Sequence, residues 1–147
     1  MNEISGIYIL TEGGNVLFNH EIYVQGSDSL DSSLFSNFVL SIQQFSNTMG
    51  EKEANRIELG KSKVFLNKDT KSSLIFVIKS SQSADNKKMN NYLKQIRTKF
   101  LKQFSDDLKK YPADNLKMYI YNLFITEIEK IIKDKLDSNF ADFFDTL

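Results

Sequence analysis

The run Leu74-Ile75-Phe76-Val77-Ile78 is apolar at every position, and it constrains the fold more than any other stretch of the chain. A strand with one face in water alternates apolar and polar residues, whereas a strand that is apolar throughout is covered on both faces. Residues 7–10, Ile7-Tyr8-Ile9-Leu10, form a second run of this kind. We therefore predict that both runs are strands in the middle of one sheet, with more polar strands toward its edges.

A predicted hairpin surrounds Gly13-Gly14, which lies between strands at residues 4–10 and 16–23. Two adjacent glycines after a strand can also form a phosphate-binding loop, but such a loop carries a following Lys and Ser or Thr and leads into a helix. Here a second strand follows, so we expect a turn in which the glycines adopt positive φ. His20, the chain's single histidine, has no second histidine at metal-ligand spacing, and we interpret it as an ordinary strand residue.

An amphipathic helix of about five turns is predicted between residues 30 and 49, because apolar side chains recur there at steps of three and four residues. Asp28 and Asp31 lie at its start, where carboxylates cap free N–H groups and interact with the positive end of the helix dipole. Gly50 is the predicted stop. The apolar positions are Leu30, Leu34, Phe35, Phe38, Ile42, Phe45 and Met49.

Residues 56–66 predict a second hairpin around Gly60-Lys61, followed by a polar turn at residues 67–70 and then the apolar run at residues 74–78. Two further amphipathic helices complete the chain, one that ends at Tyr111 because a proline follows and one that begins with Pro112. Their apolar positions are Met89, Leu93, Ile96, Phe100, Phe104 and Leu108, and then Leu116, Ile120, Leu123, Phe124, Ile128, Ile131 and Ile132. The predicted order of elements is ββαβββαα, without a repeat or linker, which indicates one domain.

The composition argues against several classes of function. The 147 residues include no Cys and one His, so we expect no disulfide framework, no zinc or other metal site and no cofactor. Lys and Arg number 19 and balance 19 Asp and Glu, which argues against binding to nucleic acid. We expect a soluble, cytoplasmic protein, since no signal peptide is evident and no apolar run approaches the roughly 18 residues of a membrane span.

The charges are unevenly distributed along the chain. Residues 1–60 carry eight acidic and two basic side chains, whereas residues 87–111 carry eight basic and two acidic ones. The eight bases are Lys87, Lys88, Lys94, Arg97, Lys99, Lys102, Lys109 and Lys110. We expect them to spread around the polar face of the second helix without forming a stripe and interpret them as solvated. Peripheral contact with an acidic partner or an anionic lipid surface is the alternative.

The closest carboxylate pairs do not indicate catalysis. Asp106 and Asp107 are adjacent, and Glu127 and Glu129 are two residues apart. Side chains at these spacings point in different directions from a helix and cannot share a proton or a substrate. No other catalytic constellation can be assembled from these residues, and we predict that the protein is not an enzyme.

The order of elements resembles that of the longin domain, and the resemblance covers residues 3 to about 110. It implies the longin or profilin-like α-β-α sandwich of the roadblock/longin superfamily, an α/β fold of the α+β type with a five-stranded antiparallel sheet in the order 2-1-5-4-3. The residues similar to stand-alone archaeal longins of the Asgard type are Ile7-Tyr8-Ile9-Leu10, Gly13-Gly14, Val16-Leu17-Phe18, the Phe-rich helix and Ile57-Glu58-Leu59-Gly60.

The resemblance also implies a function. Longin domains are non-enzymatic interaction modules that serve in vesicle trafficking and in platforms that bind and regulate Ras-like small GTPases, commonly as paired domains. The expected partners are a small GTPase or another longin or roadblock protein, in a homodimer or heterodimer. Residues 1–111 would form the longin-like domain and residues 112–147 a C-terminal helical extension packed on it. No heptad repeat or membrane anchor follows as in the longin SNAREs, so direct fusion activity is not expected.

Two groups of residues are candidate partner-binding sites. Asp28 and Asp31 form the acidic end of the first helix, beside the first hairpin. Phe140, Phe143 and Phe144 would fall on one side of a continued helix in the tail. We expect this tail either to pack on the parent domain, in the groove beside the first helix, or to dock on a partner.

A function from a different class is the alternative. A domain of PAS-like shape would sense a small molecule bound between the sheet and a helix. A large internal apolar cavity would favour this reading, because small-molecule sites are concave and mostly apolar.

Overall fold

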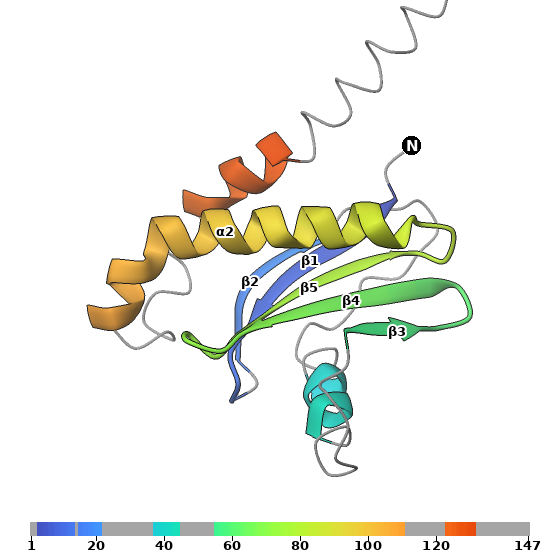
Figure 1. Ribbon diagram of the computed structural model, residues 1–147, viewed down its shortest axis with the longest axis horizontal. Helices are drawn as coiled ribbons and strands as arrows, with labels where there is room; N and C mark the ends of the chain where they lie inside the picture. The colour runs from blue at the N-terminus through green and yellow to red at the C-terminus, as the bar shows by residue number, and fades with distance from the viewer. Residues whose placement is uncertain (1–2, 14, 22–36, 45–54, 111–122, 132–147) are drawn as a thin grey trace, which may run out of the picture.

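The computed structural model describes residues 3–13, 15–21, 37–44, 55–110 and 123–131 (Figure 1). Its strands are β1 (Ile4–Leu10), β2 (Val16–Glu21), β3 (Arg56–Glu58), β4 (Ser62–Asp69) and β5 (Leu74–Ser81). The helix α2 (Asn86–Lys110) follows β5, and residues 37–44 and 123–131 are also helical. The elements come in the predicted order ββαβββαα.

The five strands form one antiparallel sheet in the order β2-β1-β5-β4-β3, which confirms the expected topology. β1 and β5 lie in the middle, and the side chains from Leu74 to Ile78 are at most 3% exposed. Figure 1 shows how both faces are covered: α2 crosses one face of the sheet, and the helical residues 37–44 lie on the other side. The two fully apolar runs are therefore central strands, as predicted.

Alternation along the central strands divides the core into two clusters. Ile7 and Ile9 of β1 belong to the cluster beneath α2, whereas Tyr8 and Leu10 belong to the cluster that includes Val39 of the helical residues 37–44. All five side chains are at most 1% exposed. Burying the two faces of one strand against different helices is what makes an uninterrupted apolar run necessary.

Aromatic rings join α2 and the helical residues 123–131 to the sheet. The ring centroid of Phe100 lies 5.7 Å from that of Phe76 in β5 and 5.1 Å from that of Phe124. Phe124 in turn lies 5.6 Å from Phe18 of β2 and 5.9 Å from Phe104, with the rings edge to face. Edge-to-face pairs of this kind stabilise beyond the area that they bury. The space between α2 and this side of the sheet is thus filled by side chains.

The turn of the first hairpin is closed by backbone and side-chain hydrogen bonds. The Thr11 N–H donates to the Asn15 carbonyl at 2.8 Å, and the Asn15 N–H donates to Thr11 Oγ1 at 3.0 Å. The predicted turn is confirmed, but the expected positive φ is wrong for Gly13, which does not adopt the left-handed region. The loop spans more than the two residues of a tight turn, so Gly13 does not need that conformation. Gly14 lies outside the described residues.

The turn between β4 and β5 comes later than the sequence predicts. Asn67, Lys68 and Asp69, expected in the turn, continue the ladder of β4 opposite β5, and the turn occupies residues 70–73. Ser73 adopts φ 60°, a left-handed conformation that is uncommon for a residue with a side chain. The polar side chains are accepted in β4 because they find partners on neighbouring elements.

Candidate functional site

Two hairpin turns and the last turns of α2 border a pocket of about 640 Å³ at one end of the sheet. The β1–β2 turn contributes Glu12, and the β4–β5 turn contributes Lys71. Leu101 and Leu108 of α2 are half-buried and line the pocket together with Leu74. An apolar wall with opposite charges at the rim can hold an apolar group of a ligand or partner.

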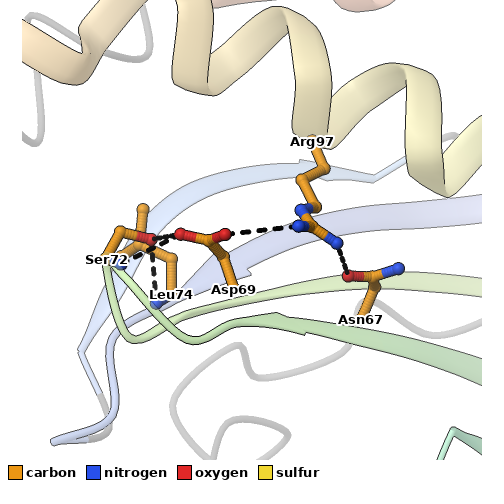
Figure 2. Close-up of polar contacts among 5 residues, drawn as sticks. All are labelled: Asn67, Asp69, Ser72, Leu74 and Arg97. Atoms are coloured by element: carbon orange, nitrogen blue, oxygen red, sulfur yellow. Dashed lines mark hydrogen bonds and ion pairs between the residues drawn. The ribbon is translucent and has the colours of Figure 1, made fainter.

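A buried carboxylate at the edge of this pocket fixes the β4–β5 turn to α2 (Figure 2). Asp69 Oδ2 accepts hydrogen bonds from the Ser72 N–H at 2.9 Å and the Ser72 hydroxyl at 2.7 Å. Its Oδ1 accepts from Arg97 of α2 at 3.3 Å, and the same guanidinium donates to Asn67 Oδ1 at 2.9 Å. Arg97 therefore bridges two residues on one face of β4, and Asp69 orders the turn that follows.

The pKa of Asp69 lies below its usual value, although two opposing effects act on it. Burial alone would raise the pKa, but the hydrogen bonds from Ser72 and the charges of Arg97 and Lys71 outweigh it. The carboxylate therefore stays ionised near neutral pH and is a weak base. Its surroundings indicate a structural role for Asp69.

The tyrosines with shifted pKa values also serve packing. Burial raises the pKa of Tyr8, and the carboxylate of Glu21, which accepts a 3.3 Å hydrogen bond from the Tyr8 hydroxyl, raises it further. The ring of Tyr8 covers Gly6, where an added Cβ would lie 2.7 Å from the Tyr8 hydroxyl oxygen. Burial, with a smaller effect of Glu3, raises the pKa of Tyr92. Neither phenol is activated toward nucleophilic chemistry, which requires a lowered pKa.

His20 lies in β2 opposite Ile7 and is half-buried, in agreement with its interpretation as a strand residue. Burial lowers its pKa, and the opposing charge of Glu129 recovers part of that shift. Within the described part of the chain, no group of three or more His, Cys, Asp or Glu side chains could hold a metal ion. None of the helices described there is long and apolar enough to span a membrane.

One edge of the sheet and a few exposed apolar side chains offer contact surfaces. β3 is an edge strand of three residues, and the next residue, Leu59, is 42% exposed. The other large hydrophobic side chains that are exposed among the described residues are Phe38 at 38% and Leu123 at 43%. An edge strand leaves unpaired N–H and C=O groups that another chain can pair with.

No family model matches the chain, and no curated protein matches its sequence. Solved structures are similar to it at low identity. A chain of the mammalian SRP receptor aligns with a TM-score of 0.59 and 13% identity over 95% of this chain and 99% of its own. MglB of Myxococcus xanthus aligns with a TM-score of 0.53 and 13% identity over 70% and 85%, respectively. The chain has the longin/roadblock fold. The expected similarity to archaeal longins of the Asgard type stays a prediction.

The residues predicted to bind partners cannot be placed in this longin/roadblock fold. Asp28, Asp31, Phe140, Phe143 and Phe144 all lie outside the described residues. The division into a domain of residues 1–111 and an extension likewise stays a prediction, although Phe124 of the extension packs into the core beneath α2.

The sequence did not point to the pocket or to the bridge between Asp69 and Arg97. A usable signal was present: an Asp three residues before a Ser is typical of a turn in which the carboxylate accepts from backbone and hydroxyl. A turn at residues 67–70 hides this pattern, because it assigns Asp69 to the turn itself and not to the strand before it. The partner Arg97 is separated by 28 positions, and only the folded chain brings the two together.

Proposed function

We propose that the protein is a longin-like interaction module that acts as a scaffold or regulator for a Ras-like small GTPase or for a trafficking-type complex. The observation that carries this proposal is the longin/roadblock fold, which aligns with a chain of the mammalian SRP receptor over 95% of this chain. The resemblance of the sequence to longins adds the GTPase as the partner class.

The chemistry of the described residues supports binding rather than catalysis. Asp69, Tyr8, Tyr92 and His20 owe their shifted pKa values to packing or to structural hydrogen bonds. The interface between α2 and the sheet is filled by phenylalanines, which disfavours the PAS-like alternative with a small molecule between sheet and helix. A ligand retained in native mass spectrometry would restore that alternative.

The edge at β3 is our proposed contact with a second longin or roadblock domain. Three residues of β3 leave hydrogen-bonding groups at the edge, and Leu59 adds exposed apolar area beside them. Pairing of edge strands would join two sheets in a homodimer or heterodimer. Asp28, Asp31 and the tail phenylalanines remain candidate contacts with a GTPase.

A binding assay tests the partner class directly. The purified chain is mixed with the small GTPases of its source, each loaded with GDP or with a non-hydrolysable GTP analogue, and the nucleotide-exchange and hydrolysis rates are measured. We expect binding to at least one GTPase with a preference for one nucleotide state. Absence of binding across the full set would contradict the proposal.

Light scattering tests the edge. Replacing Leu59 by Lys is expected to lower the average mass of the protein in solution toward that of a monomer, because a charge opposes burial at the edge. Leu123→Lys is the matched control, since Leu123 is equally exposed but lies in the helical residues 123–131. Equal masses for both variants and the unaltered chain would rule out this edge as the contact.

A further inference from the structure

The outward face of α2 carries a row of lysines. Lys87, Lys94, Lys102 and Lys109, here called the lysine ridge, are all exposed and are spaced seven, eight and seven residues apart. Each step is close to two turns at 3.6 residues per turn, so the four side chains lie along one side of a helix over roughly 33 Å. The expectation that the bases form no stripe is therefore wrong for these four.

Two other bases of α2 make contacts away from the ridge. Arg97 reaches down to Asn67 and Asp69 on the sheet, and Lys99 pairs with Glu127 of the helical residues 123–131 at 3.8 Å. Glu127 lies equally close to Lys130, so it is already shared between two cations. By helical period, the ridge itself lies on the side of α2 opposite its buried residues, among them Ile96 and Phe100.

No acidic residue interrupts the ridge along most of its length. From Asn86 to Ser105 the sequence contains no Asp or Glu, and the exposed residues between the lysines include Asn91, Gln95 and Thr98. Carboxylates flank this stretch: Asp85 immediately before the helix, where it accepts from the Lys88 N–H, and Asp106 toward the far end. In a chain with equal numbers of acidic and basic residues, this concentrates positive charge on one face.

The ridge is also held rigidly. Beneath it, Phe100 and Phe104 are at most 1% exposed and pack against Phe124, and Arg97 ties the middle of the helix to β4. The lysines therefore project from one side of an anchored helix. Such a row can approach an extended surface with several charges at once.

The absence of apolar anchors on the ridge distinguishes between acidic partners. Protein interfaces have a buried apolar centre enriched in aromatic residues and Arg, and they are depleted in Lys. The large exposed hydrophobic residues of the described chain, Phe38, Leu59 and Leu123, all lie outside α2. Single-stranded nucleic acid would call for exposed aromatic rings among the bases. Attraction to anionic lipid headgroups requires only clustered lysines near the membrane surface.

We propose that the lysine ridge docks the protein on an anionic lipid surface, with α2 lying parallel to the membrane. This inference does not depend on the proposed partner GTPase. Because each lysine near such a surface contributes about fivefold in binding, four lysines give weak and reversible attachment that falls as salt rises.

Co-sedimentation with vesicles tests this docking. The purified full chain is mixed at low salt with phosphatidylcholine vesicles that contain either no or about one-third phosphatidylserine. We expect binding only to the anionic vesicles and its loss at high salt. The ridge variant, with Lys87→Gln, Lys94→Gln, Lys102→Gln and Lys109→Gln, is expected to lower the partition coefficient on the order of several hundred-fold.

A charge-matched control separates the ridge from net charge. Lys61→Gln, Lys71→Gln, Lys99→Gln and Lys130→Gln also remove four exposed cations, and this variant is expected to retain most of the binding. Circular dichroism melts verify that both variants fold. Equal losses in the two variants, or no preference of the unaltered chain for anionic vesicles, would overturn the proposal. Loss of GTPase binding by the ridge variant, without vesicle binding by the unaltered chain, would assign the ridge to an acidic protein instead.

Discussion

Several residues stabilise the fold through hydrogen bonds and close packing at the places where two elements meet. Asp69 is 7% exposed and receives hydrogen bonds from both the turn that follows it and the helix above it. Tyr8 is similarly placed. Its ring occupies space that a side chain at Gly6 would fill, and its hydroxyl donates a hydrogen bond to Glu21. We expect a small substitution in either set of contacts to lower the free energy of unfolding clearly.

Replacing Asp69 by Ala is expected to destabilise the fold by about 1–3 kcal/mol, because it leaves the Ser72 donors and Arg97 without their acceptor. Arg97→Gln should cost less, under about 1 kcal/mol, since the guanidinium side chain is 38% exposed and the turn keeps its hydrogen bonds. Urea unfolding of the two variants measures the difference. Equal losses would mean that the turn contributes nothing beyond the ion pair.

Gly6→Ala is expected to destabilise by about 1–3 kcal/mol, because the new Cβ would lie 2.7–3.0 Å from the buried ring of Tyr8. Gly60→Ala is the control, since nothing lies within 4 Å of a Cβ at that position. If ring overlap is the cause, the loss should shrink in a Tyr8→Leu background, which a double-mutant cycle reports as a coupling energy. Additive losses would point to the backbone instead.

At the scale of elements, sequence patterns predicted the strands whose positions depend on continuous apolar faces. The apolar runs at residues 7–10 and 74–78 predicted the central strands, and the resemblance to longin domains implied the strand order that the sheet has. The end of β4 was missed because Asn67 and Asp69 look like turn residues until Arg97 supplies their partner. The lysine ridge was missed because a count of basic residues does not show on which side of the helix each one lies relative to the buried side.

The helical residues 123–131 are expected to fold as one unit with the sheet. Phe124→Ala should destabilise by about 3–5 kcal/mol, since its ring contacts Phe18, Phe100 and Phe104. Leu123→Ala, one position away and 43% exposed, should change stability by less than about 0.5 kcal/mol. Unfolding in urea, followed by far-ultraviolet circular dichroism for helix content and by the near-ultraviolet signal for aromatic packing, should show one shared transition. A separate early transition would mean that this segment folds independently.

On the scale of the whole molecule, the fold buries the faces of the sheet and leaves other surfaces exposed for contacts. Side chains fill both faces of the sheet, so contacts with other molecules are left to the rim and to the outside of the helices. The β3 edge is one such surface, and the pocket at the end of the sheet adjoins the lysine ridge, because Lys109 of the ridge also lines the pocket. The proposed contacts with a second domain and with a membrane would therefore use separate surfaces, the β3 edge and the lysine ridge.

The stability of the whole molecule is expected to fall in two stages as the pH decreases. The pKa of His20 is lowered from 6.5, so below about pH 6.5 the unfolded chain takes up a proton that the folded chain resists. The pKa of Asp69 is lowered from 3.8, so its contribution is complete above that pH and is lost as the pH falls through its folded pKa. Urea midpoints measured from pH 8 to pH 3 in steps of about one unit resolve the stages. His20→Gln should remove the first stage and keep the second, because His20 is the chain's single histidine; an unchanged profile would assign the first stage to another group.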